Sequence, residues 1–559
     1  MTLSSAARDV VQFLRSEFAS RAQIDVLSID TRSYPEETNY IVYVAEDDVA
    51  EASAVGNALD DELAEQLPRA FVVVRKAGKD LASQAKSTTL TKGVQDPRAT
   101  DLIRLISARS RVSLAQPSLS YVRDAEANIS AVTAGRHHLI FGRRGAGKTA
   151  LLVEARQQLQ REGAITAWVN IQTLRNESPD RVILYVLEEL LSQALAAMKH
   201  VKSESVVSVD LTHVYESVRG LLLRSDVVKK DVTGLAPRVQ RALSRFLDIE
   251  GASVFVFLDD FYYLPRQDQP GILDLLHGCV RDCDAWLKVA SIRHLTRWFQ
   301  SSPPLGLQTI HDADTIDLDV TLQDPGRAQD FLENVLQRYS THVGVPALTR
   351  LFSSTALDRL VLASGAVPRD YLVLASSAIA KSQNRQNATL VGAQDVNQAA
   401  GDAAGAKLQE LEDDMASNVG TADRTLSALK VVRDFCLEEK SYTYFLVSYR
   451  DKEARATEYN LLTDLMDVRL VHLLDSGVSD PHAAGQRSEA FLLDLSQYSG
   501  SRLKQRIQVL DFSKGRVVSR QTRTAGAPKI GNTPLQVISI LRGAPMFSLD
   551  RLSEIASRP

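Results

Sequence analysis

Residues His138–Glu162 read HLIFGRRGAGKTALLVEARQQLQRE, and the architecture of the central part of the chain follows from this segment. Its apolar start, Leu139–Phe141, predicts a strand buried in a parallel sheet. Gly142–Thr149 then matches the pattern GxxxxGK[ST] at every fixed position. A run without Gly or Pro follows and predicts a helix that ends at Gly163. A strand, a glycine-rich loop and a helix in this order predict a phosphate-binding loop (P-loop) within an α/β domain.

The residues of this loop would hold the phosphates of a nucleoside triphosphate through backbone N–H groups and one lysine. We expect contacts from Gly142, Arg143, Arg144, Gly145, Ala146, Gly147, Lys148, Thr149 and Ala150. Lys148 can reach the β- and γ-phosphates, and the Thr149 hydroxyl can ligate Mg²⁺. ATP or ADP with Mg²⁺ is therefore the expected ligand, and the alternative is a glycine-rich turn without a ligand.

A second signal is an apolar run, Val254–Leu258, that leads directly into Asp259 and Asp260. Such a run predicts a strand buried on both faces, which delivers the two carboxylates to the carboxyl edge of the sheet. We expect Asp259 to hold Mg²⁺ and Asp260 to orient the attacking water. The alternative is a strand followed by a solvated acidic turn.

Further polar residues lie where a sensor of the γ-phosphate is expected. The apolar run Trp286–Ile292 predicts the next strand, with Ser291 and Arg293 at its end, and Thr315–Asp319 predicts another short strand. Arg369 lies at the expected start of a helix, where a cation is unfavourable with the helix dipole, so a phosphate would be a sensible partner. Arg293 could equally be a surface cation at a strand end.

The composition is that of an ordinary soluble globular protein, with 44% hydrophobic and 24% charged residues among 559. No apolar run is long enough for a membrane span, and three cysteines in this length favour a reducing compartment, so we expect a cytoplasmic protein. Cys279 and Cys283 have no companions at metal-site spacing and are expected to pack in the core. The net charge of −4 indicates no particular partner.

Residues 1–95 predict a small α/β domain with a mixed sheet, because the expected elements follow in the order α-β-β-α-β. These elements are a helix at Ser5–Arg21, strands at Ile24–Ile29 and Tyr40–Ala45, a helix at Asp48–Gln66 and a strand at Ala70–Val74. No catalytic constellation stands out here, so we expect a structural or interaction domain. The polar stretch Ala77–Thr100 predicts a linker.

The C-terminal part predicts a winged-helix-like domain. Its expected elements are helices at Asp423–Glu439 and Glu453–Met466 and strands at Tyr444–Ser448, Arg469–Leu474 and Glu489–Leu495. Arg502–Lys529 then holds eight Lys or Arg residues against the single acid Asp511, and such a segment could contact the phosphate backbone of DNA. The alternative is a protein-interaction or autoinhibitory module with a solvated tail. The acids of the second helix argue against reading of a DNA groove.

Four motifs together give the chain a resemblance to AAA+/STAND-type P-loop ATPases, in particular to their origin-recognition-like branch in bacteria and archaea. They are the P-loop, the LDD that ends at Asp260, the SIR at 291–293 and the GAVPR at 365–369, all within Asp124–Gly401. The resemblance implies a five-stranded parallel core with a helical lid, nucleotide held between the two, and nucleotide-dependent assembly of a homo-oligomer. It also implies that Arg293 is the strand-end sensor and that Arg369 is a lid arginine on the γ-phosphate.

Two positions depart from the common AAA+ pattern. Asp260 stands where Glu is usual, and the first sensor lacks the usual Asn. Both departures resemble STAND switch ATPases, so the resemblance implies slow hydrolysis. An arginine finger is not assigned, because the sequence offers Arg281 and Arg297 with nothing to choose between them.

These elements predict an α/β multidomain chain. The expected parts are a small α/β interaction domain at 1–95, a P-loop ATPase core with a parallel sheet at 96–320, a helical lid and connector at 321–420, a winged-helix-like domain at 421–512 and a basic C-terminal extension at 513–559. Three functions stay open. The first is a switch ATPase whose nucleotide state controls self-assembly and a protein partner. The second is an ATPase that loads onto duplex DNA, and the third is a non-catalytic interaction protein with a structural nucleotide. Stand-alone bacterial proteins of this type resemble components of anti-phage or mobile-element systems.

Overall fold

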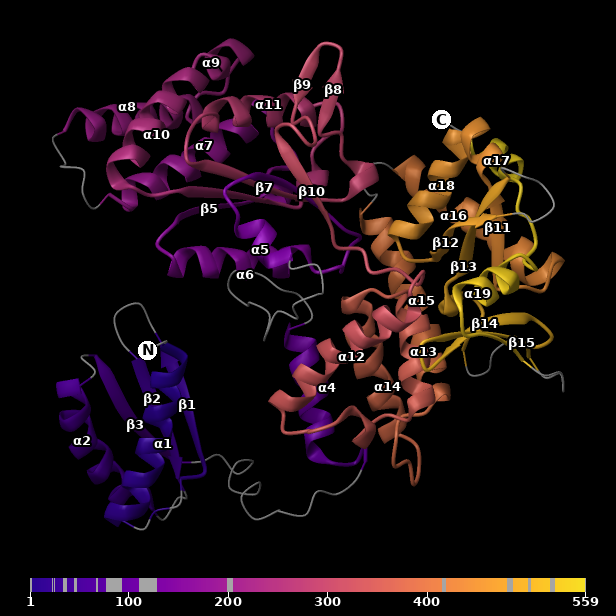
Figure 1. Cartoon of the computed structure of the whole chain (residues 1–559), viewed down its shortest axis with the longest axis horizontal. Coiled ribbons are helices and arrows are strands. Elements are labelled where there is room, and N and C mark those ends of the chain that lie inside the picture. Colours follow the sequence, from indigo (N-terminus) through magenta and orange to yellow (C-terminus); the bar gives the residue numbers. More distant parts are fainter. Residues whose placement is uncertain are drawn as a thin grey trace. The chain divides into compact units, whose positions relative to one another are not determined.

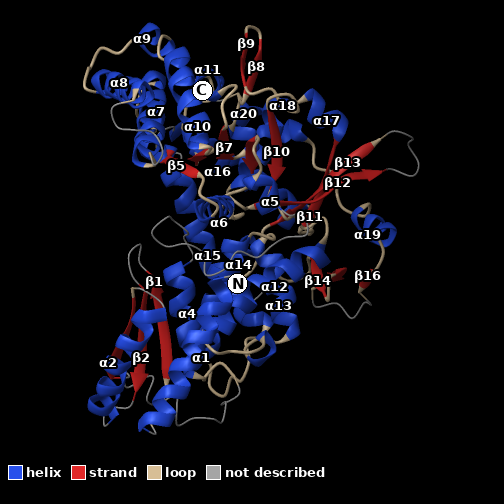
Figure 2. Ribbon diagram, turned by 60° about the vertical axis from the view of Figure 1, so that its left-hand side comes forward, coloured by secondary structure: helices blue, strands red, loops and turns tan. Residues whose placement is uncertain are grey.

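Figure 1 shows the computed structural model of the chain, and Figure 2 shows its helices and strands from a second direction. The structure describes residues 3–22, 24, 26–33, 38–44, 48–66, 69–76, 93–109, 128–198, 205–414, 419–479, 486–500, 504–522 and 528–557. The chain divides into two compact units, Met1–Thr91 and Lys92–Pro559. Most of the linker that we expected at Ala77–Thr100 lies outside the described residues.

The first unit is a mixed three-stranded sheet packed against helices, which confirms the expected order of elements. Its elements are α1 (Leu3–Ala22), β1 (Ser28–Ser33), β2 (Thr38–Val44), α2 (Val49–Gln66) and β3 (Ala70–Lys76). β1 pairs with β2 antiparallel, and β2 pairs with β3 parallel. The first strand begins at Ser28 rather than at Ile24, because the Ile24 N–H is used at the end of α1, where it donates to the Phe18 carbonyl.

The second unit contains the parallel sheet that the P-loop motif predicts (Figure 1). Its strands are β4 (His137–Phe141), β5 (Ile165–Asn170), β6 (Val254–Asp259), β7 (Ala285–Ser291) and β10 (Ala313–Asp317). They lie in the order β10-β4-β7-β6-β5, and each neighbouring pair is parallel. The strand before the P-loop and the strand that ends in the two acids therefore lie on either side of β7. All carboxyl ends share one edge, where parallel α/β sheets bind their ligands.

Alternate side chains of the central strands enter two separate cores. Leu139 and Val256 enter the first core, and Ile140 and Phe257 enter the second. The helices of the first core are α7 (Pro179–Ala196), α8 (Val206–Leu222), α10 (Ala236–Glu250) and α11 (Gln269–Val280). Those of the second core are α5 (Asn128–Thr133) and α6 (Lys148–Arg161), on the opposite face of the sheet (Figure 1). Burial on both faces explains why the strands read as continuous apolar runs.

A helical layer, called the lid below, follows the sheet in the chain. It consists of α12 (Pro325–His342), α13 (Ser354–Ser364), α14 (Pro368–Gln383) and α15 (Ala393–Asp414). Helix α4 (Pro97–Arg109) precedes the sheet in the chain but packs against α12 and α14, and its Leu102 and Ile106 belong to the core of the lid. The residues from 96 onward, which we assigned to the ATPase core, therefore begin with a helix that completes the lid.

The C-terminal part shows the helices and hairpin that we expected there, in the expected order. Its elements are α16 (Val419–Asp434), β11 (Tyr444–Ser448), α17 (Tyr449–Ala454), α18 (Ala456–Asp467), β12 (Val471–Ser479) and β13 (Arg487–Leu493). The strands form an antiparallel sheet in the order β11-β13-β12. The expected polar loop after Leu474 is partly strand, because β12 continues to Ser479 and still pairs with β13, with register shifts before Asp475 and before Val478.

Beyond this sheet the chain folds back onto the same part, so residues 513–522 and 528–557 are not the basic extension that we expected. β14 (Gln508–Ser513), β15 (Arg516–Gln521) and β16 (Lys529–Gly531) form a second antiparallel sheet, and α19 (Pro534–Leu541) follows. The boundary expected at 512/513 falls inside the β14–β15 hairpin, which turns at Lys514 and Gly515 with φ angles of 52° and 72°. The bridge between Leu446 and Met546 joins the last residues to β11.

The composition led to two further expectations, one about membrane-spanning helices and one about the cysteines. Among the described residues, none of the helices has the length and apolarity that crossing a membrane requires. Cys279 and Cys283 are buried free thiols, as expected, and burial raises the pKa of Cys283 to about 11.

Candidate nucleotide site

The glycine-rich loop Gly142–Gly147 joins β4 to α6 at the carboxyl edge of the sheet. Gly145 and Gly147 have φ angles of 80° and 104°, which residues with a Cβ rarely adopt. A Cβ on Gly147 would meet no atom within 4 Å, so there is open space at the start of α6. The loop therefore places the N-terminus of a 14-residue helix beside free space, which is the arrangement that binds phosphate.

Lys148 is buried, and its ammonium group turns toward the loop itself. It donates to the carbonyl oxygen of Gly142 at 2.7 Å and to that of Arg143 at 3.2 Å. Burial lowers the pKa of Lys148, and the nearby carboxylates counteract this effect. The lysine predicted to reach the phosphates is thus held by neutral acceptors, which charged phosphate oxygens can replace with stronger hydrogen bonds.

The two acids at the end of β6 lie beside the start of α6. Thr149 Oγ1 donates to Asp259 Oδ2 at 2.9 Å, and the Asp260 N–H donates to Asp259 Oδ1 at 3.0 Å. Burial and the charge of Asp260 raise the pKa of Asp259 to about 7. Burial also raises the pKa of Asp260, against the attraction of Lys148 and Arg144. A buried and a half-buried carboxyl group next to a hydroxyl fit a divalent cation, and Thr149 and Asp259 are the residues that would hold it.

Tyr262 belongs to this site, although the sequence analysis missed it. The Arg144 guanidinium lies 5.3 Å from the centre of its ring, and the Lys148 ammonium lies 6.0 Å from it. The Tyr262 hydroxyl acts on Asp260 by lowering the pKa of its carboxyl group, and burial raises the pKa of Tyr262. Tyr262 therefore connects the cations of the P-loop to the acid expected to orient water. The available signal was an aromatic pair, Tyr262 and Tyr263, close behind the two acids.

The two candidate sensor residues at the end of β7 have different surroundings. Arg293 forms an ion pair with Asp317 at 3.2 Å, and its guanidinium lies 4.5 Å from the centre of the Phe141 ring. Ser291 shares a hydrogen bond with Thr296 at 2.5 Å. Arg293 thus lies over the last residue before the P-loop, whereas the Ser291 hydroxyl is used within its own loop.

The lid contacts the P-loop through the first turn of α14. The Arg369 N–H donates to the Gly145 carbonyl at 3.4 Å, and a Cβ on Gly145 would come within 2.9 Å of the Arg369 Cβ. Arg143 makes a second link, because its N–H donates to Asp319 at 2.7 Å and its guanidinium donates to the Gly365 carbonyl at 3.2 Å. The backbone of Arg369 therefore lies beside the P-loop, and the contact of its guanidinium with the γ-phosphate stays a prediction.

The two candidates for an arginine finger lie at opposite edges of the sheet. Arg281 precedes β7, and its carbonyl accepts from Gln240 at 3.1 Å. Arg297 follows β7 with an exposed side chain, and its N–H donates to Gln269 at 2.7 Å. Of the two, Arg297 is the one at the edge that carries the P-loop.

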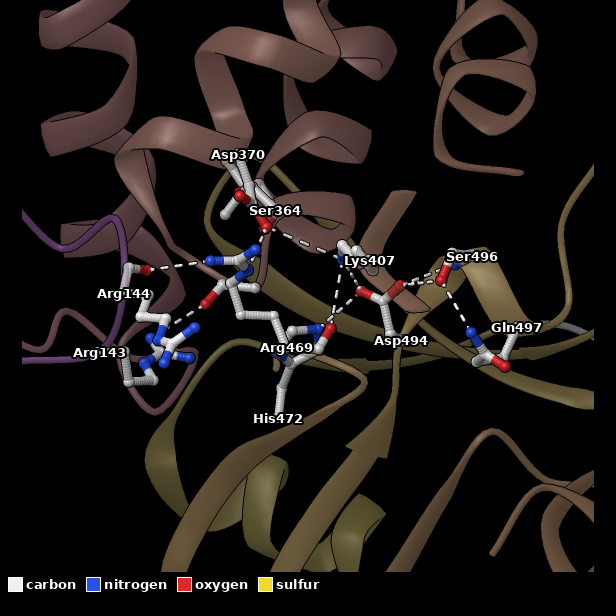
Figure 3. A network of polar contacts seen from close by, with 12 residues as sticks. Arg143, Arg144, Ser364, Asp370, Lys407, Arg469, His472, Asp494, Ser496 and Gln497 are labelled. Carbon is white, nitrogen blue, oxygen red and sulfur yellow. Dashed lines mark hydrogen bonds and ion pairs between the residues drawn. The ribbon is translucent and has the colours of Figure 1, made fainter. Parts of the chain in front are cut away.

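A further contact to the P-loop comes from the C-terminal part, and the sequence analysis did not foresee it. Arg469, between α18 and β12, donates from Nη1 to the Arg144 carbonyl at 3.3 Å (Figure 3). Its Nε lies 3.0 Å from Asp370 Oδ2, and the two side chains are only 5% and 12% exposed. Asp370 directly follows Arg369 in α14. One buried arginine thus contacts both the P-loop and the first turn of the lid.

A buried polar network continues this contact behind Arg469 (Figure 3). His472 Nε2 donates to Asp494 Oδ2 at 2.8 Å, and Lys407 of the lid donates to the same oxygen at 3.1 Å. Burial alone would raise the pKa of Asp494, but Lys407 and the hydrogen bonds outweigh it and hold this pKa below its usual value. Burial lowers the pKa of His472. A Cβ on Gly365 would clash with the His472 ring, so the glycine lets the lid and the C-terminal part come this close.

Comparison with known proteins does not show the family of this chain, so its function is inferred from its own geometry. No protein-family model matches the chain, and no curated protein matches it. Among solved structures, the Orc1 protein of Aeropyrum pernix in complex with DNA is similar at 15% sequence identity and a TM-score of 0.34. The similarity covers 67% of this chain and 90% of the solved one. At this TM-score the likeness carries no argument about fold or function.

Proposed function

We propose that this chain is an ATP-binding and ATP-hydrolysing switch of the AAA+/STAND type. The observation that carries the proposal is the contact of Arg469 with the Arg144 carbonyl and with Asp370, since it joins the P-loop, the lid and the C-terminal part at one buried point. In this proposal the nucleotide decides whether the C-terminal part stays docked. Its release permits self-assembly and the binding of a protein partner.

Different residues around the P-loop bind the nucleotide and promote its hydrolysis. Lys148 leaves its loop carbonyls and neutralises phosphate charge, while Thr149 and Asp259 hold Mg²⁺. Mg²⁺ held there would supply positive charge that stabilises the γ-phosphoryl group during its transfer to water. Asp260 orients the attacking water, and Tyr262 positions Asp260 through its hydroxyl group.

The P-loop also transmits its state to the C-terminal part. When Lys148 leaves the carbonyls of Gly142 and Arg143, the loop loses two internal hydrogen bonds and is free to shift. The next carbonyl along the chain, that of Arg144, accepts from Arg469. A shift of the loop therefore changes the contact that holds the C-terminal part in place.

Asp260→Asn should leave ATP binding intact and slow hydrolysis by roughly 10²-fold, because the amide keeps the shape of the side chain but cannot accept a proton from water. Steady-state phosphate release and nucleotide affinity should be measured on the same preparation. Asp282→Asn is a matched control, since Asp282 and Asp260 share a φ angle of 57° and Asp282 precedes β7 at the opposite edge of the sheet. An unchanged rate in Asp260→Asn would mean that another residue orients the water.

Arg297→Ala should lower kcat of the assembled protein by about 10³-fold, because an arginine supplied to a neighbouring nucleotide stabilises the charge of the transition state. The affinity of the unassembled chain for ATP should not change. Arg281→Ala is the control, because Arg281 lies at the edge of the sheet away from the P-loop. Equal rates in the two variants would exclude Arg297 as the finger.

An ATPase that engages duplex DNA is the second candidate, and the exposed cations Lys514 and Arg516 of the β14–β15 hairpin favour it. Against it, α18 already faces the ATPase core, where the Asp467 carboxylate contacts His294, so one face of this helix is used. ATP hydrolysis should be measured with and without duplex DNA at increasing salt, with Lys148→Ala as the blank. Stimulation that fades with salt would favour the DNA-engaging ATPase, and turnover indifferent to DNA would favour the switch.

A further inference from the structure

Three side chains that commonly ligate metals meet where the loop after β7 faces helix α18. His294 lies in the 3₁₀ turn Arg293–Leu295, and Asp464 and Asp467 lie one turn apart on α18. One ligand atom from each of the three side chains lies within 4.8 Å of the other two. The i, i+3 spacing places both carboxylates on the same face of α18. The cluster therefore draws its ligands from the ATPase core and from the C-terminal part.

A second observation concerns the imidazole of His294. Its Nε2 atom is fully buried and contacts a carboxylate oxygen of Asp467, yet it makes no hydrogen bond to any described residue. A buried imidazole nitrogen without a hydrogen bond is costly, and a carboxylate beside it calls for a positive partner. Both side chains retain some exposure, 28% and 15%, which leaves an entry path for an ion.

We propose that His294, Asp464 and Asp467 bind a divalent transition-metal ion, with Zn²⁺ as the best match, and that this ion fastens α18 to the ATPase core. Imidazole nitrogen and carboxylate oxygen are both ligand types that Zn²⁺ accepts, and water would complete a four-coordinate site. The imidazole disfavours Mg²⁺ and Ca²⁺, which prefer oxygen ligands only. Arg424 of α16 also acts on the charge of Asp464, but a single arginine balances at most one of the two carboxylates.

This metal site goes beyond the proposed switch, because it requires neither nucleotide nor hydrolysis. It lies next to Arg293 on one side and shares its helix, α18, with the segment that leads to Arg469. A bound ion would therefore hold the C-terminal part on the core at a second point, in addition to the Arg469 contact. The stability of docking would then depend on the supply of the metal as well as on the nucleotide.

The test uses the full chain after treatment with a chelator and without nucleotide. Zn²⁺ uptake should be titrated by calorimetry in the wild type, in His294→Ala and in Asp467→Asn. His213→Ala is the matched control, since His213 is exposed on α8. We expect His294→Ala and Asp467→Asn each to take up one equivalent less than the wild type, and His213→Ala to behave as the wild type. Far-ultraviolet circular dichroism verifies that each variant is folded.

Equal Zn²⁺ uptake in the wild type and in His294→Ala would overturn the proposal. It would show that His294 and Asp467 form an ion pair that needs no metal. A second readout is hydrogen exchange of α18, which should slow with Zn²⁺ in the wild type and not in Asp467→Asn. Lys148→Ala should keep the full Zn²⁺ uptake, so failure of the nucleotide site and failure of the metal site give different results.

Discussion

Lys148→Ala should abolish nucleotide binding, with a loss of affinity of about a hundredfold or more. Lys148 is the buried cation of the P-loop, and its present acceptors, the carbonyls of Gly142 and Arg143, are neutral groups of the loop itself. A hydrogen bond to a charged group contributes about 1.5–3 kcal/mol, and removal of the ammonium also leaves phosphate charge without compensation. Equilibrium titration with a fluorescent ATP analogue measures the effect.

The control for this experiment is Lys230→Ala, because Lys230 is exposed on the short helix α9 (Lys229–Thr233). It removes one positive charge from the same unit without contact to the P-loop. Nucleotide affinity that is unchanged in Lys148→Ala would contradict the assignment of Gly142–Thr149 as the phosphate site. The Arg469 contact would then need an explanation without nucleotide.

Arg469→Ala should release the C-terminal part from the P-loop and speed the dissociation of bound nucleotide. The substitution removes the donor to the Arg144 carbonyl and leaves Asp370, 12% exposed, without its nearest cation. Breaking a buried ion pair from one side costs about 3–5 kcal/mol, which would shift the docking equilibrium by roughly two to four orders of magnitude. Stopped-flow release of a fluorescent ADP analogue and limited proteolysis measure the two consequences.

Arg551→Ala is the matched control, because Arg551 forms an exposed ion pair with Glu439, and exposed pairs contribute at most about 1 kcal/mol. Gly365→Ala reaches the same docked interface without a change of charge, since the added Cβ would clash with the His472 ring. Both Arg469→Ala and Gly365→Ala should therefore release nucleotide faster than Arg551→Ala. Nucleotide release at the wild-type rate in both variants would rule out a role of this interface in retaining bound nucleotide.

The features that the sequence predicts well are those whose signal is local. The P-loop and the acids after Val254–Leu258 are each contained in one strand and its turn, so a short segment determines their place at the sheet edge. The two cores also follow from sequence, because strands buried on both faces read as continuous apolar runs. The backbone of Arg369, in the first turn of α14, lies beside Gly145, but the contact of its guanidinium with a phosphate stays a prediction.

The features that the sequence does not predict depend on contacts between distant segments. Arg469 lies in a turn with a φ angle of 60°, and no motif near it in the chain indicates that its partners are Arg144 and Asp370. The sequence analysis missed the β14–β15 hairpin because its cations suggested a solvated segment, whereas Val509 of β14 and Val517 of β15 are buried. Tertiary packing, and not local propensity, decides these positions.

The proposed control of the Arg469 contact by nucleotide is tested most directly by hydrogen–deuterium exchange of the wild-type chain with ADP and with a non-hydrolysable ATP analogue. Protection of residues 142–150 verifies that each nucleotide is bound. The account predicts faster exchange in residues 456–474 with the ATP analogue than with ADP, because release of Arg469 exposes the amides of α18 and β12 to water. It also predicts no such difference in Lys148→Ala. Equal exchange in residues 456–474 with both nucleotides would contradict a switch in which the nucleotide controls the C-terminal part.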